Sequence, residues 1–197
     1  MNPEASMENL RKGILLSTAM SEKSLSELLK LFSSIILRTD DFFIRAGEYP
    51  LYLAFIVKGI VYSYYTDLHG NKTVKGIFIP GMYALPMPSF IFRNPSFMSF
   101  QAVNEAVIFR SKYSDIQLLS KKDRTVQFFL RSLIDREWIV NRELHDAGLH
   151  VYNYQSRYGL FREKFKDSAH LIPDDIVASY LDIPLKQLEK IQVLLKD

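Results

Sequence analysis

The sequence predicts an α+β protein. In this prediction, N-terminal helices precede a jelly-roll-like antiparallel β-roll, a long helix follows the roll, and a small helical domain ends the chain. Three observations lead to it: strand-like runs between residues 34 and 110, a seven-residue apolar repeat over residues 120–149, and two short helical patterns after residue 173. We therefore divide the chain into residues 1–119, 120–149 and 150–197.

The strand-like runs are rich in β-branched and aromatic residues, which favour strands. Glycines at positions 47, 59, 70 and 81 interrupt these runs at separations of 12, 11 and 11 residues. Regular turn residues between short strands are typical of an antiparallel sandwich or a jelly roll. Later strands are expected over residues 97–103 and 106–110.

Short helices are expected on both sides of the roll. Apolar residues recur at helical spacing over residues 8–18 and 21–32, before the strands, and over 114–119, after them. In the last part of the chain, residues 159–165 and 174–181 show the same spacing. These segments account for most of the chain outside the strands and the long helix.

The long helix is predicted over residues 120–149, with Ser120 and Asp123 as caps at its start and Gly148 as its C-cap. A seven-residue apolar repeat normally packs against a second helix, so we expect a homodimer formed through this helix. Phe128 and Trp138 lie off the repeat and are expected to pack on the chain's own domains. The alternative is a helix buried in one core. The predicted dimer contacts are Leu130, Leu133, Glu137, Val140 and Leu144.

The composition is that of a globular protein, with 48% hydrophobic and 24% charged residues. The chain has no cysteine, which excludes disulfides, thiolate zinc sites and cysteine-held iron–sulfur clusters. The net charge of +3 permits nucleic-acid binding without arguing for it. No apolar run reaches the length of a membrane span and no signal-peptide pattern is present, so we expect a cytoplasmic protein without a membrane partner.

The sequence does not indicate an enzyme. The histidines at positions 69, 145, 150 and 170 lack the paired spacing of a metal site. There is no glycine-rich phosphate loop and no Gly-x-Ser-x-Gly motif. The aspartate pairs at 40–41 and 174–175 are typical of turns and helix caps. We therefore expect no catalytic residue, no metal and no cofactor.

Two motifs resemble those of the Crp/Fnr transcription regulators. Gly47-Glu48, followed by Phe-Ile-Val-Lys-Gly-Ile-Val over residues 55–61, is similar to the Gly-Glu turn and strand pair of their β-roll. Residues 176–191 are similar to their helix-turn-helix. The resemblance covers roughly residues 25–196. It implies a cyclic nucleotide-binding-like roll that senses a ligand, a dimerisation helix and a C-terminal helix-turn-helix that reads DNA.

In that family the nucleotide phosphate is held by a Glu and by an Arg that follows a Pro. Here Pro95 is followed by Ser, Phe and Met, and Arg93 is the only formal charge between residues 81 and 104. A buried phosphate needs a well-placed cation, so we do not expect cAMP to be the effector. Either aromatic and methionine side chains fill the roll, or a small apolar or aromatic effector binds there. The candidate residues for that effector are Met82, Tyr83, Arg93, Ser96, Phe97 and Ser99.

The last helix, predicted over residues 185–196, is the candidate DNA-reading helix, because a helix-turn-helix places its second helix in the major groove. Its predicted contact residues are Lys186, Gln187 and Lys190. The arginines usual in the family are missing there, and residues 157–197 carry equal numbers of basic and acidic side chains. The predicted function is a DNA-binding transcription regulator of the Crp/Fnr type. The alternative is a β-roll protein that binds a protein partner or a small ligand, with the C-terminal helices as a cap.

Overall fold

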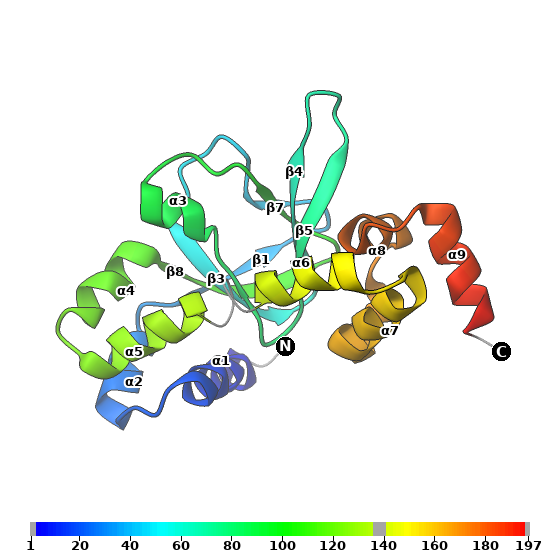
Figure 1. Ribbon diagram of the computed structural model, residues 1–197. Helices are drawn as coiled ribbons and strands as arrows, with labels where there is room; N and C mark the ends of the chain where they lie inside the picture. The colour runs from blue at the N-terminus through cyan, green and yellow to red at the C-terminus, as the bar shows by residue number, and fades with distance from the viewer. Residues whose placement is uncertain (1–2, 136–140, 196–197) are drawn as a thin grey trace.

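The computed structural model describes residues 3–135 and 141–195, and of residues 3–5 and 141–144 it describes the backbone alone. The strands are β1 (Ser33–Leu37), β2 (Phe42–Ile44), β3 (Tyr52–Lys58), β4 (Val61–Thr66), β5 (Lys72–Phe78), β6 (Tyr83–Ala84), β7 (Ser99–Ala102) and β8 (Ala106–Lys112). The helices are α1 (Pro3–Ser17), α2 (Glu22–Leu29), α3 (Met87–Phe92), α4 (Tyr113–Ser120), α5 (Arg124–Leu133), α6 (Asn141–Val151), α7 (Tyr154–Phe165), α8 (Asp174–Leu181) and α9 (Leu185–Leu194). A 3₁₀ helix, Lys166–Leu171, joins α7 to α8. The architecture combines antiparallel β-sheets with several helices, as the predicted α+β class requires (Figure 1).

The strands form two four-stranded antiparallel sheets. One has the order β1-β8-β3-β6 and the other β2-β7-β4-β5. Apolar side chains from both sheets fill the space between them, as a jelly roll requires. This inner core contains Leu37, Ile44, Ala54, Ile56, Val61, Ala84, Phe100, Ala102, Ala106 and Ile108.

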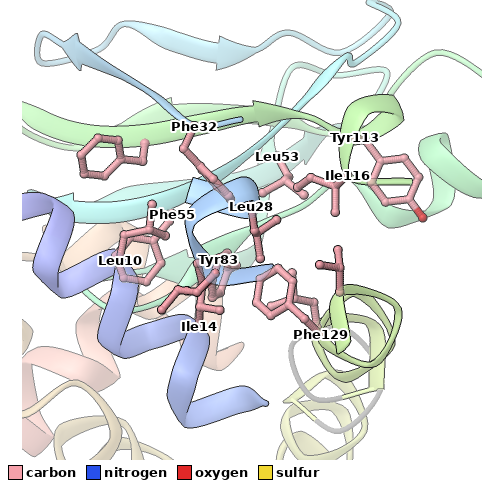
Figure 2. Packing of buried hydrophobic residues seen from close by; sticks show 14 of the residues in the cluster. Leu10, Ile14, Leu28, Phe32, Leu53, Phe55, Tyr83, Tyr113, Ile116 and Phe129 are labelled. Atoms are coloured by element: carbon pink, nitrogen blue, oxygen red, sulfur yellow. The ribbon is translucent and has the colours of Figure 1, made fainter. Parts of the chain in front are cut away.

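Strand β3 is buried on both faces, because its side chains alternate between two cores. Ala54 and Ile56 point into the roll, whereas Leu53, Phe55 and Val57 join a second core outside it. Helices α1, α2 and α5 cover this outer face. Figure 2 shows their side chains meeting the sheet, and the labelled ones include Leu10 and Ile14 of α1, Leu28 of α2 and Phe129 of α5.

The other sheet is covered by the C-terminal helices. Tyr62 and Tyr64 of β4 and Val74 and Ile77 of β5 point away from the roll and join a third core with α7, α8 and α9. The contact also includes a hydrogen bond from the Val74 amide to the hydroxyl of Ser179, at 2.9 Å. Each sheet thus has helices on its outer face: α1, α2 and α5 cover the first sheet, and α7, α8 and α9 lie beside the second (Figure 1).

The four regularly spaced glycines all have positive φ angles, which explains their spacing. They lie at turns after β2, between β3 and β4, between β4 and β5, and after β5. At Gly59 a side chain is also sterically excluded, since an added Cβ would collide with the main-chain oxygen of Glu105. The predicted strand pattern is therefore confirmed at its turns.

The predicted caps of the long helix are only partly right. Helix α5 starts at Arg124, because the Asp123 carboxylate accepts hydrogen bonds from the amides of Thr125 and Val126. Ser120 instead ends α4, where its hydroxyl donates to the Gln117 oxygen. Gly148 is not a C-cap: it lies inside α6, which continues to Val151. Helix α3 was not predicted, and α7 begins earlier than predicted, at Tyr154, with Asn153 as its N-cap.

The apolar side of α5 faces the chain's own core. Phe129 and Leu133 are almost fully buried there, and Leu130 packs against them. Phe128 was expected to face the same way but is exposed, because the burial of Val126, Phe129 and Leu133 turns it outward. Glu137, Val140 and Trp138 lie outside the described residues, as does the side chain of Leu144. In the described part of the chain, no helix has the length and apolar character to cross a bilayer.

Candidate functional site

A small cavity opens into the roll beside the second sheet. Its volume is about 100 Å³, whereas sites for small molecules usually have about 300–1,000 Å³. We call it the roll cavity. It is lined by Ser63, Lys75, Gly76, Ile77, Phe78, Met82, Tyr83, Leu85, Met98, Phe100, His145, Lys164 and Tyr180.

The lining of the roll cavity is mainly apolar and aromatic. Phe78 and Phe100 stack with their ring centroids 5.8 Å apart, and Tyr83 packs against Phe55 at 4.9 Å. The cations in the lining are lysines, which lack the forked geometry with which arginine grips a phosphate. The cavity is therefore too small and has the wrong donors for a cyclic nucleotide.

Two of the six predicted effector residues, Met82 and Tyr83, line the roll cavity. The other four lie elsewhere. Ser99 is buried and accepts a hydrogen bond from the Ala46 amide at 3.0 Å. Arg93 is exposed at the end of α3, with a φ of +52°. Phe97 is 74% exposed.

Ser96 is held by the Gly-Glu turn. Its main-chain oxygen accepts from the Gly47 amide, and its amide donates to the Glu48 oxygen, both at 2.8 Å. The Glu48 carboxylate accepts from the Arg45 amide at 3.1 Å, so it is folded back onto its own turn. The Glu48 carboxylate and the main chain of Ser96, the residue after Pro95, are thus used in local structure rather than in the roll cavity.

At the C-terminal end, α8 and α9 are joined by the short turn 182–184. Asp182 adopts the left-handed conformation, with a φ of +51°, and the Ile183 amide donates to the Ala178 oxygen at 2.9 Å. This hydrogen bond closes a Schellman-type helix end. Leu188 anchors α9 to the third core, and Ile191, one turn further on, is also almost completely buried.

The predicted DNA contacts lie on the outer side of α9. Lys186 and Lys190 are exposed and are one helical turn apart, and Gln187 beside them is half-buried. Gln192 is not part of this group, since its amide nitrogen donates to the Asp174 carboxylate at 2.7 Å. The structure thus brings Lys186, Gln187 and Lys190 together along α9.

Arg157, at the start of α7, connects the end of α6 to the turn after α8. Its guanidinium donates to the main-chain oxygens of Leu149 and Tyr152 and to those of Leu181 and Asp182. Arg157 was not among the predicted site residues, and neither were His145, Lys164 and Tyr180, which line the roll cavity. A basic residue in a polar segment offered no local signal of these long-range contacts.

Within residues 3–135 and 141–195, no three histidine, aspartate or glutamate side chains gather in a way that could hold a metal. No protein-family model matches the sequence, and no curated protein sequence matches it significantly.

Solved structures do match. FixK2 from Bradyrhizobium japonicum aligns with a TM-score of 0.73 at 17% identity, over 84% of each chain. A putative cyclic nucleotide binding protein from Ruegeria pomeroyi aligns with a TM-score of 0.69 at 16% identity, over 100% of this chain and 88% of its own. The c-di-GMP responsive global regulator CLP from Xanthomonas campestris aligns with a TM-score of 0.67 at 12% identity, over 89% of this chain and 92% of its own. The protein therefore has a Crp/Fnr-type cyclic nucleotide-binding fold.

Proposed function

We propose that this protein is a DNA-binding transcription regulator of the Crp/Fnr type that acts in the cytoplasm. The observation that carries the proposal is the exposure of Lys186 and Lys190 on one side of α9, the second helix of a pair joined by a tight turn. That pair is a helix-turn-helix in this proposal, with α9 in the major groove and its first half at the base edges. A lysine can donate to guanine and a glutamine can pair with adenine.

The similarity to regulators supports this function over the alternative of a protein that does not bind DNA. The alignments with FixK2 and CLP cover 84% and 92% of those chains. The small net charge of residues 157–197 predicts modest affinity, because phosphate contacts supply much of the binding energy.

We infer that any effector of the roll is not a cyclic nucleotide. The roll cavity is small, and Ser96 follows Pro95 where the family has its phosphate-binding arginine. This inference predicts no change in the melting temperature when cAMP or cGMP is added. A saturable increase with either nucleotide would contradict it.

We further propose a homodimer in which α5 presents its exposed side to a second copy. Leu133, a predicted dimer contact, is buried in the chain's own core. The dimer contact proposed here is therefore made by the exposed Phe128 and its neighbours Gln127 and Arg131. Phe128→Glu should raise the dimer dissociation constant measured by analytical ultracentrifugation. An unchanged dissociation constant would place the interface elsewhere.

DNA binding is tested by fluorescence anisotropy with labelled duplexes that span the region upstream of the protein's own gene. The double variant Lys186→Ala/Lys190→Ala should lose about tenfold or more in affinity, and its salt dependence should become shallower. Lys121→Ala/Lys122→Ala is the matched control, since both lysines are exposed after α4, on the opposite side of the molecule from α9 (Figure 1). If no duplex binds even at low salt, or if both double variants lose affinity equally, the proposed role of α9 is wrong.

A further inference from the structure

A larger cavity lies outside the roll, where α6 ends against α7 and α8. Its volume is about 630 Å³, within the usual range for small-molecule sites. We call it the junction cavity. It shares His145, Lys164 and Tyr180 with the roll cavity, so the two cavities adjoin at these side chains. Its remaining lining residues are Gly148, Leu149, Tyr152, Arg157, Leu160, Phe161, Glu163, Lys166 and Leu181.

Hydrogen-bond donors gather at the shared end of the junction cavity. The Lys164 ammonium donates to the Tyr180 hydroxyl at 3.3 Å. Burial raises the pKa of Tyr180, and the nearby Asp146 carboxylate raises it further, so the hydroxyl keeps its proton. A hydroxyl that accepts one hydrogen bond still has a hydrogen to donate. The His145 ring stacks on Tyr180, with 4.2 Å between the ring centroids.

The rest of the junction cavity has an apolar wall. Leu160 is 47% exposed although it lies beside the buried Phe161, so part of its side chain faces the cavity rather than the core. Leu149 and Leu181 extend the same wall. Cationic donors at one end and an apolar wall beyond them match a molecule that has an anionic group at one end and an apolar part at the other.

The charge of the junction cavity favours an anion. Arg157, Lys164 and Lys166 contribute three positive charges to the lining, against the negative charges of Glu163 in the lining and of Asp146 near Tyr180. The Arg157 guanidinium already donates to main-chain oxygens, so it would act on an anion through its charge. The Lys164 ammonium lies at the shared end, beside the Tyr180 hydroxyl. Opposite charges this close interact strongly where water is partly excluded.

We propose that the junction cavity binds a carboxylic acid with an apolar chain or ring. Its carboxylate accepts hydrogen bonds from Lys164 and Tyr180, and its apolar part lies along Leu149, Leu160 and Phe161. Such charge-assisted hydrogen bonds are strong, and the burial of the chain adds to the affinity. The occupant would contact α6, α7 and α8 together, and α7 and α8 pack directly against α9. Binding itself does not depend on the proposed DNA function.

The test uses the full chain and anilinonaphthalene sulfonate, an amphipathic anion that fluoresces in apolar sites. Decanoate should displace this probe at a concentration about tenfold lower than decanol, since the two differ in the charged head. Lys164→Met keeps most of the side chain and removes its charge, so it should abolish this preference while decanol binds as before. Leu160→Trp should fill the cavity and weaken the binding of the probe and of both ligands.

The matched controls are Lys121→Met and Leu118→Trp, because both residues are exposed at the end of α4, away from α7 (Figure 1). Both controls should bind the probe and decanoate as the unmodified protein does. Equal displacement by decanol and decanoate would overturn the carboxylate assignment. Unchanged binding in a folded Leu160→Trp variant would overturn the location. Loss of probe binding as the chain dimerises would show that a second copy occupies the cavity instead, which also overturns the proposal.

Discussion

The guanidinium of Arg157 donates from Nη1 to the main-chain oxygen of Leu181, at 3.2 Å. The acceptor belongs to the last residue of α8, and other donors of the same guanidinium reach the last turn of α6 and the residue after it, through Leu149 and Tyr152. The C-terminal ends of helices carry partial negative charge and unpaired oxygens. One cation therefore stabilises two helix ends and fixes α6 relative to the pair of helices that ends the chain.

Arg157→Met should destabilise the protein by about 2 kcal/mol, because the charge-assisted hydrogen bonds to both helix ends are lost. The free energy of unfolding in urea measures this change. Arg162→Met, at an exposed position of the same helix, should change it by less than about 0.5 kcal/mol. Equal stability of the two variants would mean that Arg157 does not hold the two helix ends together.

The Ser179 hydroxyl links α8 to the free edge of the second sheet. It accepts from the Val74 amide at 2.9 Å and lies 3.4 Å from the Lys72 oxygen, to which it donates. Among the described strands, β5 pairs with β4 alone, so the outward Val74 amide has no strand partner on that side. The Ser179 hydroxyl accepts the hydrogen bond of the Val74 amide and covers this edge of the sheet.

Ser179→Ala should cost about 1–2 kcal/mol of unfolding free energy, because it leaves the Val74 amide without its acceptor. The more specific readout is hydrogen exchange of the Val74 amide, which should become faster while the amides of β3 stay protected. Ser114→Ala, at an exposed position of α4, is the control and should leave this exchange rate unchanged. If the Val74 amide exchanges at the same rate in Ser179→Ala, the helices do not depend on this contact for docking.

The roll was predictable because its signals are local. Each turn glycine, such as Gly59, has the positive φ that its place in the sequence indicated, and the strands between the turns follow from residue type. The orientation of α5 was not predictable in this way. The apolar repeat that indicated a partner helix is satisfied by the chain's own sheet, which buries Val126 and Leu133. A repeat identifies an apolar stripe on a helix without identifying what covers it.

The candidate sites were less predictable than the fold. Lys186 and Lys190 follow from helical spacing alone, since the buried Leu188 and Ile191 turn them outward. The cavities depend on contacts between segments far apart in the chain, such as the stacking of His145 on Tyr180. Tyr62 and Tyr64 offered one usable clue, because two aromatic residues on the outer face of a strand indicate that something covers that face.

The Asp123 carboxylate couples the start of α5 to α2. Hydrogen bonds from the hydroxyls of Ser24 and Thr125, together with the Thr125 and Val126 amides, lower its pKa from 3.8 to about 2. A carboxyl group whose pKa is lower in the folded state stabilises the fold above pH 3.8, and this contribution is lost as the pH falls towards 2. The carboxylate is partly exposed, so solvent screening reduces the gain.

Asp123→Asn keeps a good capping residue but removes the charge. At neutral pH the variant should be less stable than the unmodified protein by about 1 kcal/mol, and the difference should shrink as the pH falls from 4 to 2. Urea unfolding of both proteins across this pH range measures the difference. A difference that stays constant with pH would show that the cap acts through geometry rather than through its charge.

Asp182 occupies the left-handed conformation at the end of α8, with a φ of +51° and a ψ of 52°. Its main-chain oxygen accepts from Arg157, and the Ile183 amide closes the helix end on the Ala178 oxygen. None of these bonds uses the Asp182 side chain, so a substitution there changes only the backbone preference. Aspartate tolerates this conformation better than most residues, glycine adopts it freely, and a β-branched residue is strongly disfavoured there.

Asp182→Gly removes the steric cost of the left-handed conformation, which stabilises the fold, but it also raises the entropy of the unfolded chain, which destabilises it. The unfolding free energy should therefore stay the same or rise by up to about 0.5 kcal/mol. Asp182→Val should lower it by about 1–2 kcal/mol. Urea unfolding of the two variants measures which is more stable. Fluorescence anisotropy with the labelled duplexes shows whether α9 keeps its position. Because the turn sets the angle between α8 and α9, Asp182→Val should also weaken DNA binding at temperatures where the variant remains folded. If Asp182→Val proves as stable as Asp182→Gly, the turn can relax out of the left-handed conformation.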